Sequence, residues 1–217
     1  MTFVDLSHPI RDGETTYPGL PAPVLGTHLS REESRAVYAP GTEFEIGTIT
    51  MIGNTGTYLD TPFHRFPDGF DLAGLALERC ADLEGVVVRG GDRRAIDADL
   101  LAHGEIAGRA ILFHTGWSRH FGTPAYGRSA PFLTEAAALR LVDARATLVG
   151  IDSVNIDDTD GNARPVHSIL LAAGIPIVEH LTALDRLPDR GFRFTAVPAP
   201  VAGFGTFPVR AFARVGD

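Results

Sequence analysis

Short apolar runs, separated by stretches rich in glycine and proline, dominate the pattern of this chain. Runs of β-branched and apolar residues that are too short for helices predict buried strands. They predict strands at residues 2–6, 84–90, 109–117, 146–152, 193–198 and 209–215. Residues 43–51 alternate between apolar and polar positions and predict a further strand, whereas the Gly- and Pro-rich residues 12–23 predict a loop.

Two segments have helical signals. Thr134 precedes an alanine- and leucine-rich run with a glutamate in its first turn, which is typical of a capped helix. A second helix is predicted from His167 until Gly174 ends it, followed by a strand and Glu179. Strands and helices interleave, so an α/β fold with a mixed sheet is expected. The helices are too few for a strict βαβ winding.

Composition favours a soluble globular protein. The chain has 217 residues, 44% of them apolar and 21% charged, which fits one domain over residues 1–217. No apolar run reaches the roughly 18 to 20 residues of a membrane helix. The N-terminus lacks a basic segment followed by an apolar one, and Cys80 is the only cysteine, so a cytoplasmic protein without disulfides is expected.

The charged residues exclude several function classes. The net charge is −8 and no basic stripe is visible, which argues against nucleic-acid binding. All 19 basic residues are arginine, so chemistry that needs a lysine, such as a Schiff base or a Walker-A phosphate loop, is excluded. Motifs for a nucleophilic serine, a helical zinc pair and a dinucleotide-binding loop are also missing.

The stretch GNTGTYLDTPFH, residues 53–64, is the first candidate for chemistry. Pro62 lies between Asp60 and His64, so the two are expected on a turn that projects both toward one space. A histidine with an acidic neighbour can serve as a general base. A lone histidine would more simply cap a loop, but the surrounding loop residues favour a functional site.

His167 and Glu179 form the second candidate, because a helix and a strand would bring them to one end of a sheet. Imidazole and carboxylate suit zinc or manganese, although two residues at this spacing specify little. The acidic cluster of Asp152 and residues 157–160 lacks calcium-loop spacing, so a solvated loop is expected there. Trp117 is expected to be either a buried aromatic or a pocket residue.

The order of these motifs, with DLSHPI, YPG, TGW, GID, H-x-x-LL-x-x-GI-x-I-x-E and PVRA, resembles the cyclase / kynurenine formamidase (arylformamidase-like) family of metal-dependent hydrolases. The resemblance extends from about residue 4 to residue 214. It implies a single cyclase-like domain of the swivelling β/β/α class, with a central mixed sheet and flanking helices. It also implies a homodimer or higher homo-oligomer with the active site near a subunit interface.

The family signature H-x-G-T-H-x-D-x-P-x-H departs from this sequence at two positions. Its glycine, aspartate, proline and last histidine match Gly56, Asp60, Pro62 and His64, but Asn54 and Tyr58 replace histidines. In the family, those two histidines and the aspartate bind the first metal, and the last histidine acts in acid–base catalysis. A downstream histidine and glutamate complete the metal centre, and they match His167 and Glu179.

The replacements change the expected metal chemistry. An amide oxygen is a weak partner for zinc, and a tyrosine must lose a proton from a pKa of about 10 before it ligates well. A full two-metal centre is therefore not expected. Asp60, His167 and Glu179 could still supply three ligands for one zinc or manganese ion.

Three hypotheses for a small-molecule substrate remain open. In the first, a single-metal enzyme hydrolyses a small amide, formamide or lactone, with His64 transferring protons. In the second, His64, Asp60, Tyr58 and Glu179 form a metal-independent acid–base site of a cyclase, dehydratase or isomerase. In the third, a non-catalytic relative only binds a ligand. Asn54, Trp117 and Phe63 are candidates for substrate contacts, and the sequence does not identify the substrate.

Overall fold

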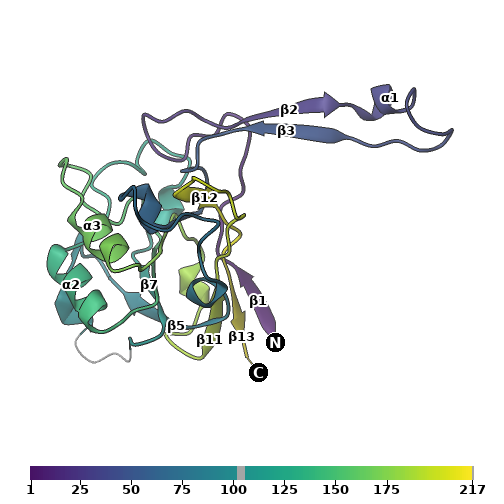
Figure 1. Cartoon of the computed structure of the whole chain (residues 1–217). Helices are drawn as coiled ribbons and strands as arrows, with labels where there is room; N and C mark the ends of the chain where they lie inside the picture. The colour runs from purple at the N-terminus through teal and green to yellow at the C-terminus, as the bar shows by residue number, and fades with distance from the viewer. Residues whose placement is uncertain (102–105, 217) are drawn as a thin grey trace.

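A nine-stranded mixed sheet runs through the centre of the protein in the computed structural model, which describes residues 1–101 and 106–216 (Figure 1). Its strand order is β1-β13-β11-β5-β7-β9-β10-β4-β12. The strands are β1 (Thr2–Asp5), β4 (Tyr58–Asp60), β5 (Leu83–Arg89), β7 (Ala110–His114), β9 (Leu148–Ile151), β10 (Ile177–Glu179), β11 (Phe192–Thr195), β12 (Thr206–Pro208) and β13 (Phe212–Val215). The four strands β5, β7, β9 and β10 are parallel, and the flanking strands pair antiparallel. The predicted mixed sheet is confirmed.

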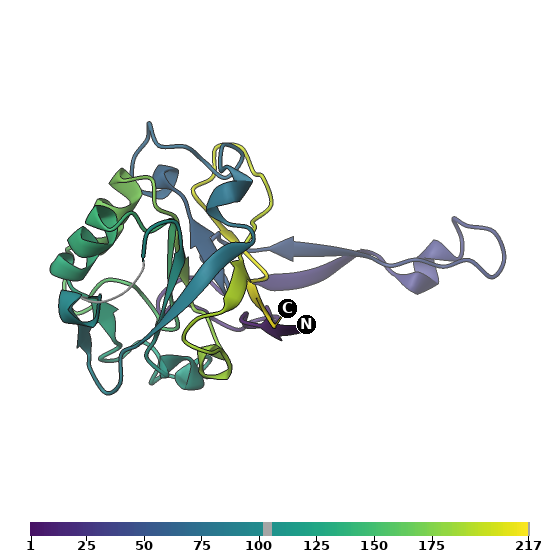
Figure 2. The same cartoon turned by 90° about the horizontal axis from the view of Figure 1, so that it is seen from below.

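The central strands are buried on both faces, as their continuous apolar runs predicted. In β7, Ala110 and Leu112 face one hydrophobic cluster, and Ile111 and Phe113 face the other. The helices α2 (Glu135–Asp143) and α3 (Pro165–Ala172) pack side by side over the second face (Figures 1 and 2). The first face packs against residues from both chain ends, such as Leu6 and Val209, and from connecting segments, such as Leu72 and Leu184.

Both predicted helices are present and end as expected. The Thr134 side chain accepts a hydrogen bond from the backbone N–H of Ala137 and so caps α2. After α3, Gly174 adopts a left-handed conformation with φ of 71°, and the chain turns directly into β10. This turn reverses the chain, so the start of α3 lies near the end of β10.

Short helical turns and two small sheets connect these elements. The turns are α1 (Arg31–Ser34), η1 (Pro62–His64), η2 (Leu77–Arg79), η3 (Ala98–Leu101), η4 (Trp117–His120) and η5 (Leu184–Arg186). The small sheets pair β2 (Val24–Leu29) with β3 (Ile46–Thr50) and β6 (Ala95–Ile96) with β8 (Phe132–Leu133). Within the described ranges, every helix is too short or too polar to cross a membrane.

The pair β2–β3 forms an arm that extends away from the rest of the protein and carries α1 at its end (Figures 1 and 2). The alternation at residues 43–51 correctly predicted a strand, yet all of β3 is exposed. Its apolar side chains therefore do not contribute to the core of this chain.

Candidate active site

The stretch at residues 53–64 is held by close contacts between backbone segments. Its centre is β4, which is buried along its whole length and pairs with β10 on one side and β12 on the other. Gly205 lies so close to the backbone of His64 that any side chain there would overlap with it, and Gly53 approaches Thr206 in the same way. The strand and the following turn η1 thus present their side chains from a fixed main chain.

His64 and Asp60 come together as the sequence predicted. The Thr206 hydroxyl donates a hydrogen bond to Asp60 Oδ1, and the same oxygen lies 2.8 Å from His64 Nδ1. Because the hydroxyl proton points to the carboxylate, His64 Nδ1–H must be the donor in the second contact. The Nε2 atom of neutral His64 is then unprotonated and available as a base, on a side chain that is 36% exposed.

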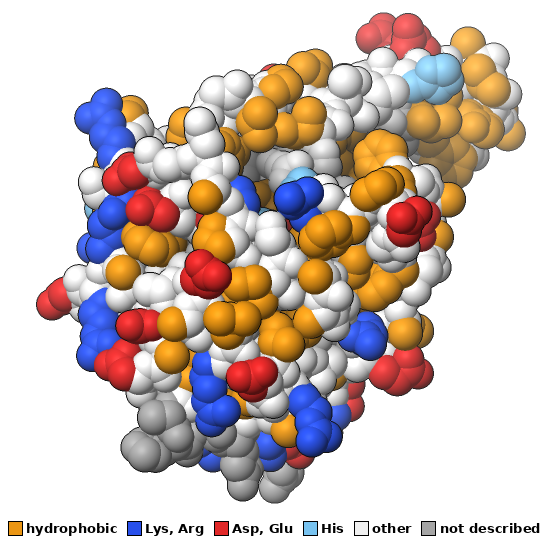
Figure 3. Space-filling view, turned by 60° about the vertical axis from the view of Figure 1, so that its left-hand side comes forward, with side chains coloured by type: hydrophobic (Ala, Val, Ile, Leu, Met, Phe, Trp, Pro, Cys, Tyr) orange, Lys and Arg blue, Asp and Glu red, His pale blue; other side chains and the backbone are white. Residues whose placement is uncertain are grey.

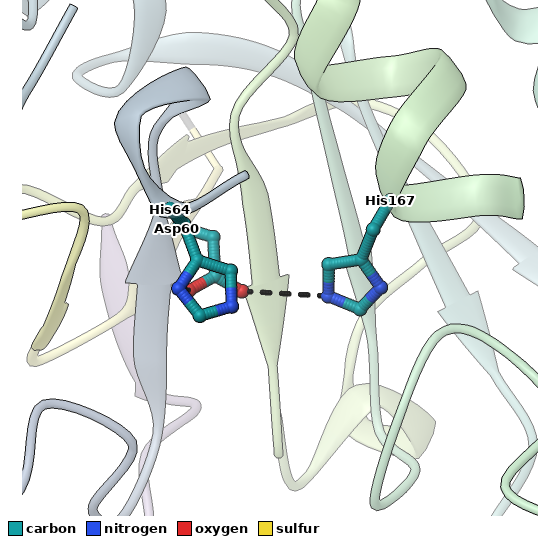
Figure 4. A group of neighbouring side chains, drawn as sticks. All are labelled: Asp60, His64 and His167. Atoms are coloured by element: carbon teal, nitrogen blue, oxygen red, sulfur yellow. Dashed lines mark ion pairs between the residues drawn. The ribbon is translucent and has the colours of Figure 1, made fainter. Parts of the chain in front are cut away.

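His167 reaches the same site from α3, facing Asp60 across the gap between the helix and β4 (Figure 4). Its Nδ1 lies 2.6 Å from Asp157 Oδ2, so that nitrogen is already engaged. Its Nε2 lies 3.7 Å from Asp60 Oδ2 and 3.6 Å from Glu179 Oε1. The predicted convergence of His167 and Glu179 is thus present in the structure.

These residues fit one divalent metal ion. Asp60 Oδ2 is buried without a hydrogen-bond partner in the described part of the chain. Asp60, His64 and His167 each offer a ligand atom within 4.8 Å of the others. Carboxylate and imidazole donors suit zinc or manganese, and the Asp157 carboxylate would fix the orientation of the ligating imidazole. Glu179 is also near, but both of its oxygens already accept hydrogen bonds, from Tyr58 and the backbone of Ile156.

Tyr58 belongs to a separate hydrogen-bond chain. Its hydroxyl donates to Glu179 Oε2 at 2.6 Å and lies 3.3 Å from His180 Nε2. The other ring nitrogen of His180 lies 2.8 Å from the Tyr126 hydroxyl. Since the Tyr58 proton points to Glu179, the chain runs from Tyr126 through His180 and Tyr58 to the carboxylate.

Burial keeps Tyr58 and His180 of this hydrogen-bond chain uncharged. Burial, with the nearby charge of Glu179, raises the pKa of Tyr58 well above its usual value. Burial also lowers the pKa of His180 to about 3, with a contribution from His8. A phenol that keeps its proton is a hydrogen-bond donor and not a metal ligand.

His167 and Glu179 have pKa values that depend on each other. Burial alone would lower the pKa of His167, but the charge of Glu179 and the contacts with Asp157 and Asp60 raise it to about 10. Burial raises the pKa of Glu179 to about 7, although the charge of His167 opposes this change. Without a metal, an imidazolium at His167 therefore compensates the buried carboxylates around it.

A cavity of about 290 Å³ opens at these side chains. Asn54, Tyr58, His64, His167 and Glu179 line it, together with Tyr17 and Leu20 from the loop at residues 12–23. Trp117 and Phe63, the other candidates for substrate contacts, are not among the lining residues. The Trp117 indole instead donates to the Tyr126 backbone and packs beside the buried chain.

The interpretation of the acidic cluster as a solvated loop is wrong for Asp152 and Asp157. Both are buried, and their carboxylates accept hydrogen bonds from Thr115 and from His167, respectively. Asp158 and Asp160 pair with Arg94 closer to the surface. The sequence analysis also missed Tyr126, His180 and Thr206, because no local motif marks contacts between residues so far apart in the chain.

Comparisons with known proteins agree with this fold. The model of the putative cyclase family matches residues 4–158. A kynurenine formamidase of Bacillus thuringiensis (strain Al Hakam) is 30% identical over 98% of this chain and 97% of its own length. One from Bacillus cereus (strain ATCC 14579) is 29% identical with the same coverage.

A solved structure of an isatin hydrolase bound to the product analogue thioisatinate is similar in fold. Its TM-score is 0.84, at 22% sequence identity, over 99% of this chain and 92% of that one. The chain belongs to the cyclase family. The predicted class, a hydrolase-type enzyme acting on small carbonyl compounds, is confirmed by these relatives.

Proposed function

We propose that the protein hydrolyses a small amide, formamide or lactone at the cavity beside His64, with one divalent metal held by Asp60 and His167. The observation that carries this proposal is the buried Asp60 Oδ2, which has no hydrogen-bond partner in the described chain and faces His167 Nε2 at 3.7 Å. A buried charged oxygen without a partner is costly unless a cation or proton compensates it. Glu179 Oε1, 3.6 Å from His167 Nε2, is the third candidate ligand.

Different residues of this chain would have separate roles in the hydrolysis. A divalent metal in this position would polarise the carbonyl and favour deprotonation of a water. His64 Nε2 accepts a proton from the attacking water and returns it to the leaving nitrogen or oxygen. The bond from the carbonyl carbon to the leaving atom breaks, one to the water oxygen forms, and an acid is released. Tyr58 keeps Glu179 oriented by its hydrogen bond.

Metal content tests this function directly. Protein purified without chelator is expected to contain about one zinc or manganese ion per chain, measured by elemental analysis. His167→Ala is expected to lose the metal and the activity together, whereas His28→Ala, an exposed histidine on the arm, keeps both. Metal retained by the His167 variant would contradict this ligand assignment.

A metal-independent acid–base enzyme is the second candidate, and one observation favours it. An imidazolium at His167 already compensates the carboxylates, as the raised pKa of about 10 indicates. If metal-free protein after dialysis against chelator keeps full turnover, this candidate replaces the first. Loss of turnover that zinc or manganese restores would instead support the metal enzyme.

We also propose that the arm makes the protein a homo-oligomer. An isolated two-stranded hairpin is at best marginally stable in water, and exposed apolar patches commonly mark interfaces. The exposed apolar side chains of the arm are Val24, Leu25, Val37, Tyr38, Phe44, Ile46 and Ile49. A second copy of this chain is the partner proposed.

The assembly has a simple test. Ile49 is 59% exposed on β3, and Ile49→Glu would place a charge within the proposed interface. Light scattering is expected to show a multiple of the 23.2 kDa chain mass for the natural protein and a single chain mass for the variant. The exposed Leu139 on α2 serves as control, since Leu139→Glu should leave the mass unchanged.

A further inference from the structure

Two arginines line the same cavity as the acid–imidazole residues. Arg65 follows the turn η1 directly after His64, and Arg164 precedes the first turn of α3, three residues before His167. Arg65 is exposed and Arg164 is half-buried, whereas His167 and Glu179 are buried. The arginines therefore lie nearer the outside of the cavity than His167 and Glu179. In Figure 3, a hollow on this face contains a histidine with basic side chains at its edge.

Neither arginine is neutralised by the described part of the chain. Arg65 Nε contacts the Ser168 hydroxyl at 3.3 Å, and its guanidinium lies over the Phe66 ring. Arg164 uses one nitrogen, Nη1, to donate to the backbone oxygens of residues 158, 161 and 163. All of these partners are uncharged. Other arginines of the protein, such as Arg89 and Arg94, have a carboxylate within 3.0 Å.

The contacts of Arg164 also limit its movement. Three backbone carbonyls hold Nη1, so the guanidinium is preorganised while Nη2 and Nε have no hydrogen-bond partner among the described residues. A planar guanidinium with free donors in a fixed fork matches a carboxylate. Preorganisation reduces the entropy lost when a ligand binds.

We propose that the substrate carries a carboxylate apart from the carbonyl that is hydrolysed, and that Arg65 and Arg164 bind it. This inference rests on the proposed hydrolytic function and adds the substrate class. The carboxylate would sit at the outer part of the cavity and direct the carbonyl toward His64 and the buried Asp60 and His167. A singly charged carboxylate suits the site better than a phosphate dianion, because the buried Asp60 and Glu179 repel a second negative charge.

A matched set of probes tests the charge preference. The probes are 3-formamidobenzoate, its uncharged methyl ester and 3-formamidophenyl phosphate, and formate release by the metal-loaded enzyme is measured. The kcat/KM for the carboxylate is expected to exceed that for the ester by about tenfold or more, mainly through KM, because charge-assisted hydrogen bonds are the strong ones. Equal values for carboxylate and ester, or a preference for the phosphate, would overturn the proposal.

Variants assign the preference to the two arginines. Arg65→Gln and Arg164→Gln are each expected to bring the ratio of kcat/KM for the carboxylate to kcat/KM for the ester close to one, and this ratio is compared with that of the natural protein. The ester is thus an internal control for a damaged site, and Arg186→Gln, at an exposed arginine outside the cavity, is expected to change neither rate. A carboxylate preference that survives in both variants would contradict the assignment.

Binding without turnover separates this proposal from the proposed function. Benzoate and benzyl alcohol contain no bond that the enzyme would hydrolyse, and calorimetry measures their affinity for the natural protein and both variants. Benzoate binding that depends on both arginines, with no formate released from any probe, would remove the hydrolytic function and leave the carboxylate site standing. Formate release with benzoate affinity unchanged in both variants would support the hydrolytic function and contradict the carboxylate site.

Discussion

The two ends of β4 differ in what they can bind. At one end, Asp60 has a buried oxygen without a hydrogen-bond partner in the described chain, 3.7 Å from the Nε2 atom of His167. At the other end, Tyr58 and Glu179 form a closed hydrogen-bond chain with His180. The Asp60 end can accept a cation, whereas the Tyr58 end is complete without one. Tyr58 therefore closes one half of the site by its hydrogen bond to Glu179, and the Asp60 half stays open to a cation.

The reason lies in the proton of the phenol. A neutral imidazole offers a lone pair to a metal, but a buried tyrosine retains its hydrogen and donates it to the nearest carboxylate. Glu179 is thereby satisfied by a neutral donor. Hydrogen bonds from the protein stabilise the negative charge of Glu179, so Glu179 is a weaker candidate metal ligand than Asp60.

The largest expected effect comes from introducing histidines at positions 54 and 58, which would remove the difference between the two ends. The double variant with Asn54→His and Tyr58→His releases Glu179 Oε2 and adds two imidazole donors beside it. Elemental analysis is expected to show about two metal ions per chain in place of about one. A double variant with Asn54→Gln and Tyr58→Phe adds no imidazole and is the control. An unchanged metal content in the folded histidine variant would show that the Tyr58 end cannot hold a metal.

The next effect is a pH dependence of stability that only the metal-free protein should show. The folded-state pKa of His167 is raised from 6.5 to about 10, so its stabilisation is fully present below pH 6.5 and is lost as the pH rises toward 10. The slope is about 1.4 kcal/mol per pH unit for one proton. Glu179, with a pKa raised from 4.5 to about 7, contributes a loss of the same sign between those two values.

Urea denaturation across this pH range measures the slope with and without chelator. Bound metal requires an unprotonated His167, so the metal-loaded protein should lack the decline. His167→Gln, which cannot take up the proton, is expected to lack the decline between pH 7 and 10, where Glu179 no longer contributes. A decline of equal slope with metal bound would argue against His167 as a ligand.

The smallest expected effect concerns the Tyr58 end of β4 alone. Tyr58→Phe leaves Glu179 Oε2 and His180 Nε2 without their partner, and it should lower the free energy of unfolding by about 1–3 kcal/mol. Metal content should stay the same, because the phenol is not a ligand. Tyr38→Phe on the exposed arm provides the control and should be neutral. Loss of metal from the Tyr58 variant would show that the two ends depend on each other.

The sequence predicted the parts of the fold and the site that local patterns determine. The capped helix after Thr134, the stop at Gly174 and the buried strands follow from local composition. The convergence of Asp60 with His64 follows from the proline between them, and that of His167 with Glu179 from a short helix leading into a strand.

Other features were outside the reach of local patterns. The exposure of β3 was not predictable, since an alternating apolar pattern does not say whether this chain or another molecule covers it. Asp157 has the sequence surroundings of a solvated loop, and only the docking of α3 buries it against His167. His180 and Tyr126 meet Tyr58 through contacts that span more than fifty residues.

The glycines that let backbone segments touch at the site have a consequence for how its chemistry can change. Gly53, Gly69 and Gly205 each lie against main-chain atoms of another segment, so the frame around Asp60 and His64 has no room to shift. A new reaction at this site would therefore have to come from substitutions of side chains, with the backbone positions unchanged. Libraries that seek altered activity should therefore vary positions 54, 58 and 65 and keep the three glycines constant.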